Sequence, residues 1–178
     1  MDLRKKKTLR AIREAFYEMR RHKNLEQISV TELAQEAEIS KATFYLHYRD
    51  IYDLSEQLQL EVIRAVFAKI DNPMEILSHP TEFMRKMVSA LESEKENIDP
   101  LFSGAQAATL PISIEANLKK YIFEQAPDLK EDAKINVYLS YHILGGYYAY
   151  VENVDKLGYK KVLHVIQNIQ NASILNEI

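Results

Sequence analysis

The chain has 178 residues, with 23 Lys and Arg against 26 Asp and Glu, and it contains no cysteine. Disulfides and thiolate metal sites are therefore excluded, which fits a reducing cytoplasm. No apolar run approaches the roughly 18 residues of a membrane span, and the start MDLRKKKTLR lacks the apolar core of a signal peptide, so we expect a soluble cytoplasmic protein without a membrane partner.

The charge is unevenly distributed along the chain. Residues 1–50 hold 11 Lys and Arg against 8 Asp and Glu, whereas residues 51–178 hold 12 against 18. The first basic cluster is Arg4, Lys5, Lys6, Lys7, Arg10 and Arg13, and the second is Arg20, Arg21 and Lys23. Such clusters attract the phosphate backbone of nucleic acids. The alternative for the N-terminal cluster is a solvated terminus.

Apolar residues at helical spacing predict a first helix over about residues 4–22. Its stripe is Leu9, Ile12, Ala15, Phe16 and Met19. After a polar stretch, a second and shorter helix is expected to begin at Ser29. There Ser29-Val-Thr-Glu32 fits a capping box, in which the serine oxygen and the glutamate each bond a backbone N–H. Its apolar stripe is Val30, Leu33, Ala34 and Ala37.

Three residues, Glu38, Ile39 and Ser40, separate this helix from a segment that starts at Lys41, with Ser40 as its N-cap. That spacing is typical of a helix-turn-helix. Phe44 and Tyr48, four residues apart, face the preceding helix. The opposite face carries small, apolar and hydrogen-bonding groups that suit DNA bases and phosphates: Lys41, Ala42, Thr43, Tyr45, Leu46 and His47. The alternative is a helical hairpin whose second helix packs elsewhere.

The motif resembles the DNA-binding signature of the TetR family of bacterial transcriptional regulators. The resemblance covers about the first 55 residues and rests on Thr31-x-Leu33-Ala34-x-x-Ala37-x-Ile39-Ser40-x-Ala42-Thr43-Phe44-Tyr45-x-His47-Tyr48. It implies a helix-turn-helix DNA-binding domain, residues 1–50, and a larger helical domain, residues 51–178, that binds a small molecule and dimerises. The DNA contacts are expected from Ser29 and Thr31, from the face described above, and from Lys5, Lys6 and Lys7.

The sequence departs from the family pattern at three positions. Glu38 stands in the turn where glycine is usual, so the turn must form without a residue that favours positive φ. Glu36 and Glu38 also add negative charge near the expected phosphates. Ile51 stands where many members carry lysine, so that phosphate contact is expected to be absent.

Beyond the motif, Asp50 is expected to cap a long helix to about Ile70 that links the two domains. Its inward stripe is Leu54, Leu58, Val62 and Ala65. Thr81, after His79-Pro80, is the expected N-cap of an amphipathic helix to about Lys95 with the apolar residues Phe83, Met84, Met87, Val88 and Leu91. The stretch 97–111 reads as short helical pieces, and 112–125 as a further helix.

The strongest pattern of the C-terminal part covers about residues 129–153. It runs through Ile135, Tyr138, Leu139, His142, Ile143, Gly146, Tyr147 and Tyr150. Gly145 and Gly146 each cost about 1 kcal/mol inside a helix, so we expect a closely approaching helix or ligand there, or else a kink. A last helix from Tyr159 to about Ile174 carries Val162, Leu163, Ile166, Ile169 and Ile174. By resemblance, the last two helices form a homodimer interface.

An effector site would lie in the C-terminal part, which holds most of the eleven tyrosines. A phenol is apolar with one polar tip, so several of them suit a planar or amphipathic ligand. The candidate residues are Phe102, Tyr121, Tyr138, Tyr141 and His142. The alternative for aromatic residues at helical spacing is a place in the core or the dimer interface.

No sequence feature predicts an enzyme. Phosphate loops, nucleophile elbows and HExxH motifs are absent, and the histidines lack metal-ligand spacing. We therefore expect an all-α protein of about nine helices, without catalytic residues, metal or cofactor. The function expected is a ligand-responsive repressor that binds a palindromic operator as a homodimer. Activation of transcription is an alternative, as is a helical ligand-binding or protein-interaction module of the same fold with weak or no DNA binding.

Overall fold

The computed structural model describes residues 3–171, which form helices and no strand, so the all-α class is confirmed. If the unbroken run from Ala133 to Leu157 is counted as one helix, this part of the chain contains nine α-helices. The chain divides into two compact units. Unit 1 is Met1–Arg64 with Glu94–Ala107, and unit 2 is Ala65–Ser93 with Ala108–Ile178. The domain boundary at residue 50 stays a prediction.

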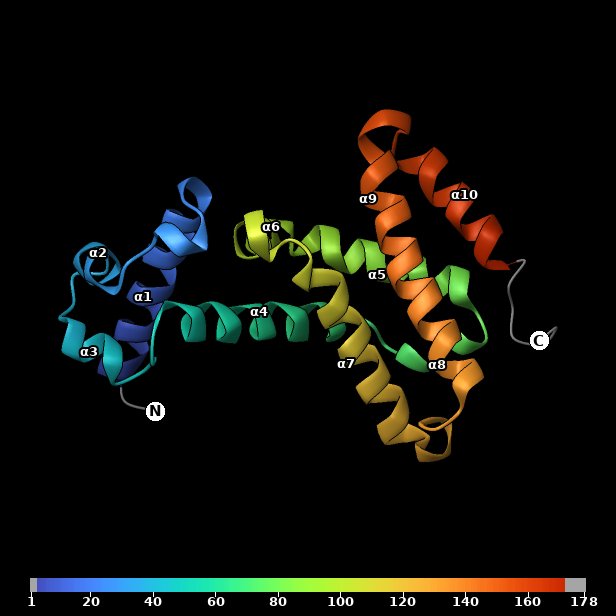
Figure 1. The fold of residues 1–178 in the computed structure, drawn as a ribbon, viewed down its shortest axis with the longest axis horizontal. Helices are drawn as coiled ribbons and strands as arrows, with labels where there is room; N and C mark the ends of the chain where they lie inside the picture. Colours follow the sequence, from blue (N-terminus) through green and yellow to red (C-terminus); the bar gives the residue numbers. More distant parts are fainter. Residues whose placement is uncertain (1–2, 172–178) are drawn as a thin grey trace. The chain divides into compact units, whose positions relative to one another are not determined.

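Unit 1 is built from five α-helices and two short 3-10 turns (Figure 1). The elements are α1 (Leu3–His22), η1 (Leu25–Gln27), α2 (Val30–Glu36), α3 (Lys41–Tyr45), α4 (Ile51–Phe67, in this unit to Arg64), α6 (Lys95–Leu101) and η3 (Gly104–Gln106). Its core side chains are excluded from solvent almost completely: Ile12, Phe16, Leu33, Phe44, Leu54, Leu58 and Leu101. The predicted inward faces of the first four helices are thereby largely confirmed, with four residues half-buried rather than buried: Leu9, Met19, Val30 and Ala65.

A buried arginine joins α6 and η3 to α1. Arg20 is 3% exposed, and its guanidinium donates to the carbonyl of Lys23 at 2.9 Å and to Oγ of Ser103 at 2.8 Å. Gln59 of α4 donates to the carbonyl of Leu101 at 3.0 Å. The bonds to Ser103 and Leu101 join residues more than forty positions apart, so the segment 94–107 packs against α1 and α4.

Unit 2 contains η2 (Pro73–Leu77), α5 (Pro80–Ser93), α7 (Thr109–Gln125), η4 (Pro127–Leu129), α8 (Ala133–Ser140), a π-helical turn (Tyr141–Gly145), α9 (Gly146–Leu157) and α10 (Tyr159–Asn171). The expected N-cap at Thr81 is wrong by two positions, because α5 already begins at Pro80, whose fixed φ suits the first turn. The helix expected from Leu129 begins at Ala133, because the Asp132 carboxylate caps it by accepting from the N–H groups of Lys134 and Ile135.

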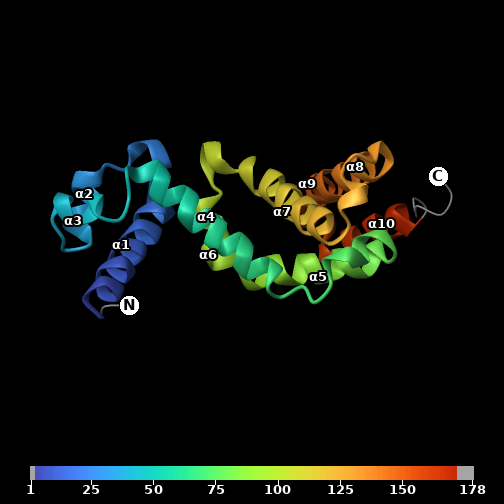
Figure 2. The same ribbon diagram turned by 90° about the horizontal axis from the view of Figure 1, so that it is seen from below.

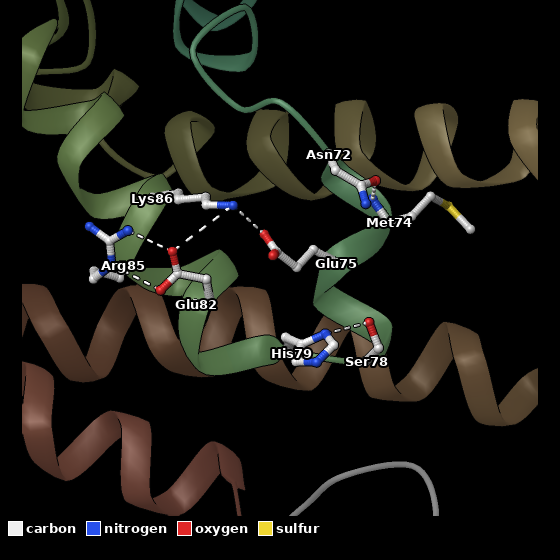
Figure 3. A network of polar contacts seen from close by, with 8 residues as sticks. All are labelled: Asn72, Met74, Glu75, Ser78, His79, Glu82, Arg85 and Lys86. Atoms are coloured by element: carbon white, nitrogen blue, oxygen red, sulfur yellow. Dashed lines mark hydrogen bonds and ion pairs between the residues drawn. The ribbon is translucent and has the colours of Figure 1, made fainter.

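Charged side chains tie η2 to α5 (Figure 3). Nζ of Lys86 lies 2.7 Å from Oε2 of Glu75 and 4.0 Å from Oε1 of Glu82. Arg85 donates to both carboxylate oxygens of Glu82, at 3.0 and 2.6 Å. A two-point contact of this kind fixes both side chains along one face of α5.

The last helix folds back on the unit. α10 lies beside α9 and α5 (Figure 2), and Met84, Val88, Val162, Leu163 and Ile166 form a buried cluster there. The predicted stripe of α10 is confirmed at these positions, whereas Ile169 is half exposed. The predicted end near Ile174 lies outside the described residues.

The two adjacent glycines differ in their surroundings. A Cβ atom on Gly146 would lie 2.6 Å from Cε of Met84 and 3.3 Å from Nε2 of Gln170. The expected close approach of another helix is therefore found at Gly146, from both α5 and α10. A Cβ atom on Gly145 would meet nothing within 4 Å.

Candidate nucleic-acid interface

The helix-turn-helix begins with the capping box that the sequence predicts. The N–H of Glu32 donates to Oγ of Ser29 at 3.2 Å, and the N–H of Ser29 donates back to Oε2 of Glu32 at 3.2 Å. This backbone bond is the main cause that holds the pKa of Glu32 below its ordinary value. Because the Ser29 hydroxyl is engaged with Glu32 as well, Ser29 positions the helix start, next to the exposed Thr31.

The turn between α2 and α3 is closed by backbone hydrogen bonds. The N–H of Ile39 donates to the carbonyl of Ala34 at 2.9 Å, and the N–H of Glu38 donates to that of Gln35 at 3.1 Å. This is the Schellman arrangement, which requires a left-handed residue after the helix. Glu38 occupies that position with φ 53°, and it is the one non-glycine residue of positive φ in the described part of the chain. The turn therefore forms without glycine, at a backbone cost.

α3 is anchored on one side by aromatic packing. Oγ of Ser40 accepts from the N–H of Thr43 at 3.0 Å and lies 2.8 Å from the Thr43 hydroxyl. Phe44 is fully buried and Tyr48 nearly so, with ring centroids 5.6 Å apart. The helix ends at Tyr45, and the N–H of His47 bonds the carbonyl of Phe44 and tightens the last turn.

The outward face of α3 has the predicted composition. Tyr45 is 56% and Leu46 80% exposed, Lys41 and Ala42 are exposed, and Thr43 and His47 are half-buried. The face carries no carboxylate of its own, although Glu36 and Glu38 are exposed just before it. An apolar side chain beside a phenol and a cation suits contact with thymine methyl groups, base edges and phosphates in a groove.

The two basic clusters of α1 differ in their surroundings. In the first cluster, Lys5, Lys6 and Lys7 are exposed and no ion pair engages them within residues 3–171, whereas Arg10 pairs with Glu14 and Arg13 with Glu61. In the second cluster, Arg21 pairs with Glu18 and Lys23 with Glu32. Arg20 is buried, and this burial lowers its pKa below the ordinary value. Arg20 is therefore enclosed in the core, whereas the expectation that Arg21 and Lys23 attract phosphates stays a prediction, because their ion pairs lie on the surface.

The start of α4 adds a cation that the motif analysis missed. Asp50 caps α4 by accepting from the N–H of Asp53 at 2.8 Å. Asp53 accepts from the N–H of Arg49 at 2.8 Å, and this bond is the main cause that lowers the pKa of Asp53. The Arg49 side chain is 82% exposed, although its guanidinium lies 3.5 Å from Oδ1 of Asp53. Ile51 is buried in the core, so Arg49 is the nearest cation after α3. Arg49 directly follows Tyr48, the last residue of the motif, and this position in the sequence could have identified it as a further DNA-contacting cation.

The candidate effector residues do not form one site. Phe102 belongs to unit 1, where it is buried. The Tyr138 hydroxyl donates to the carbonyl of Ile76 at 3.2 Å, which makes Tyr138 a core residue of unit 2. Tyr121 is half-buried on α7. Tyr141 and His142 do lie together, beside a small cavity next to the π turn.

Comparisons with family models, with curated proteins and with solved structures give no match. Among residues 3–171, no group of three or more His, Asp or Glu side chains is arranged to hold a metal ion. No helix in that range has the length and apolar character needed to cross a membrane.

Proposed function

We propose that this protein is a sequence-specific DNA-binding transcription regulator of the TetR type, acting as a ligand-responsive repressor. The observation that carries the proposal is the outward face of α3. It presents Lys41, Tyr45 and Leu46 to solvent, while Phe44 holds the helix rigidly on the unit 1 core. In a helix-turn-helix, the second helix enters the major groove and its side chains contact base edges.

The phosphate contacts come from groups outside the reading helix. Lys5, Lys6, Lys7 and Arg49 are exposed cations of unit 1, and each neutralised phosphate releases counterions and strengthens binding. Ser29 and Thr31 lie at the start of α2, where backbone and hydroxyl groups commonly contact phosphates. The negative charges of Glu36 and Glu38 weaken this attraction, so a second subunit is needed for tight binding.

A homodimer supplies a second copy of the DNA-reading helix α3. Unit 2 exposes large apolar side chains on α8, the π turn, α9 and α10, and we assign them to the face that a second copy covers: Val137, Tyr141, Tyr148, Val151, Val165 and Ile169. A second copy that covers this face would place two α3 helices on one duplex. A dimer of this kind reads half-sites about 34–36 Å apart or a multiple of that distance.

Regulation follows from the fixed spacing of the half-sites. α4 begins after α3 and continues into unit 2, so it is the helix through which unit 2 acts on the helix-turn-helix. A ligand that binds one arrangement of the dimer more tightly than the other shifts the population between DNA-binding and released states.

Gel-shift titration of a Tyr45→Ala variant tests the proposal, with a duplex first selected for binding to the wild type. Loss of Tyr45 should weaken binding by about 1–3 kcal/mol if the phenol contacts a base or a buried phosphate. Ile112→Ala is the control, because Ile112 is similarly exposed but lies on α7 of unit 2, outside the proposed dimer face. Equal affinity of the Tyr45→Ala variant and the wild type would refute the assignment of α3 as the reading helix.

A further inference from the structure

A small cavity lies between the π turn and α10 in unit 2. Its volume is about 160 Å³, and its walls are mostly apolar. The residues that define it are Tyr141, His142, Gly145, Gly146, Ile166 and Gln170. An engineered apolar protein cavity of about 150 Å³ is large enough for a benzene molecule. The space therefore fits one six-membered ring with a small substituent.

The backbone beside the cavity departs from regular helix. Residues 141–145 form a single π-helical turn inside the run from Ala133 to Leu157. Such turns are rare and occur often at functional sites. Gly145 lines the cavity, and a Cβ atom there would meet nothing within 4 Å. Packing of the protein on itself does not require this glycine, and its missing side chain leaves the cavity open.

Two buried polar atoms beside the cavity have no partner in residues 3–171. They are Nδ1 of His142 and Oε1 of Gln170, on side chains that are 3% and 4% exposed. Both residues line the cavity. A buried polar atom without a hydrogen bond destabilises the fold, so such atoms in a native protein indicate a missing partner. A molecule in the cavity could supply bonds to both.

The surroundings define the charge of that molecule. Burial lowers the pKa of His142, so the imidazole is neutral at pH 7, with one ring nitrogen as donor and the other as acceptor. Within the described chain no Lys, Arg, Asp or Glu lines the cavity. A charged ligand would lose its hydration there without gaining an ion pair.

We propose that this cavity binds a small neutral molecule with one apolar ring and one hydroxyl group, such as a simple phenol. The hydroxyl would donate to Oε1 of Gln170 or bond Nδ1 of His142, and the ring would fill the space left by Gly145. Tyr141 and Ile169, at the cavity, also belong to the proposed dimer face. The assignment of this ligand as the effector rests on the proposed function, whereas its binding does not.

Calorimetric titration of the full chain with phenol tests the site, with benzene as a probe of the same ring and no hydroxyl. Phenol should bind at least 10-fold more tightly than benzene. Gln170→Met should lower phenol affinity about 10-fold and leave benzene affinity unchanged. Gly145→Leu should abolish binding of both probes by filling the cavity. Gln167→Met is the matched control, since Gln167 lies on α10 but does not line the cavity.

Several results would overturn the site. They are the absence of phenol binding at millimolar concentration, equal affinities for phenol and benzene, and phenol binding that survives Gly145→Leu. Phenol affinity that falls as the protein concentration rises would show that a second copy of the chain, and not phenol, fills the cavity. Gel shifts of the wild type separate the phenol site from the proposed function. A wild type that binds phenol but no DNA would contradict only the proposed function.

Discussion

Replacing Glu38 by glycine should stabilise the protein, although it removes a side chain. Glu38 has φ 53° in the turn that joins α2 to α3. A non-glycine residue in this left-handed region costs about 1–2 kcal/mol. Glycine loses about 0.4–1 kcal/mol through the greater entropy of the unfolded chain. The net expectation is a gain of about 0.5–1 kcal/mol, or a Tm higher by about 1–4 °C.

Two neighbouring variants isolate the backbone cause of this gain. Glu38→Ala removes the same carboxylate but keeps the strained Cβ, so its stability should stay close to that of the wild type. Glu36→Gly also removes an exposed carboxylate, but Glu36 is the last residue of α2, and glycine there should destabilise by about 1 kcal/mol. Urea unfolding followed by circular dichroism measures all three. A Glu38→Gly protein no more stable than Glu38→Ala would refute the role assigned to the backbone.

Three further predictions concern charge and burial. Neutralising Lys5, Lys6 and Lys7 should reduce the slope of log affinity for DNA against log salt concentration by about 5, because the two subunits of the proposed homodimer carry six of these lysines. Neutralising the exposed Lys130, Lys134 and Lys156 of unit 2 should leave the slope unchanged. Ser103→Ala removes a partner of the buried Arg20 and should lower the unfolding free energy by about 1.5–3 kcal/mol, against near zero for the exposed Ser89→Ala; equal losses would show that Arg20 does not hold α6. Burial lowers the pKa of His142 in the folded state. As the pH falls below about 6.5, the imidazole is therefore protonated more readily in the unfolded chain than in the folded one, and the free energy of unfolding decreases. His142→Gln should remove part of that decline in pH-dependent unfolding, and the exposed His164→Gln should not.

The local signals in the sequence predicted most of the secondary structure. Ser29, Ser40 and Asp50 cap α2, α3 and α4 as expected, because a cap depends on residues only two or three positions away. Apolar periodicity also predicted the buried face of α8 and the π turn, where Ile135, Leu139 and Ile143 are buried. These features are short-range, and one sequence is enough to find them.

The remaining features depend on contacts between distant residues. Arg20 was expected to attract phosphates, yet Ser103, which lies 83 positions further along the chain, takes part in its burial. The π turn at Tyr141–Gly145 interrupts a pattern that reads as continuous helix. The cavity needs residues of both that turn and α10. Neither spacing nor composition encodes which helices meet, so these parts of the site required the structure.

Selection from random duplex DNA tests the central claim most directly. The full-length wild type should enrich an inverted repeat whose half-sites are centred about 10 base pairs, or a multiple of that, apart. The Tyr45→Ala variant, run in parallel, should fail to enrich the same sequence. Absence of any enriched sequence with the wild type, or enrichment of the identical repeat by Tyr45→Ala, would contradict the claim that α3 reads DNA.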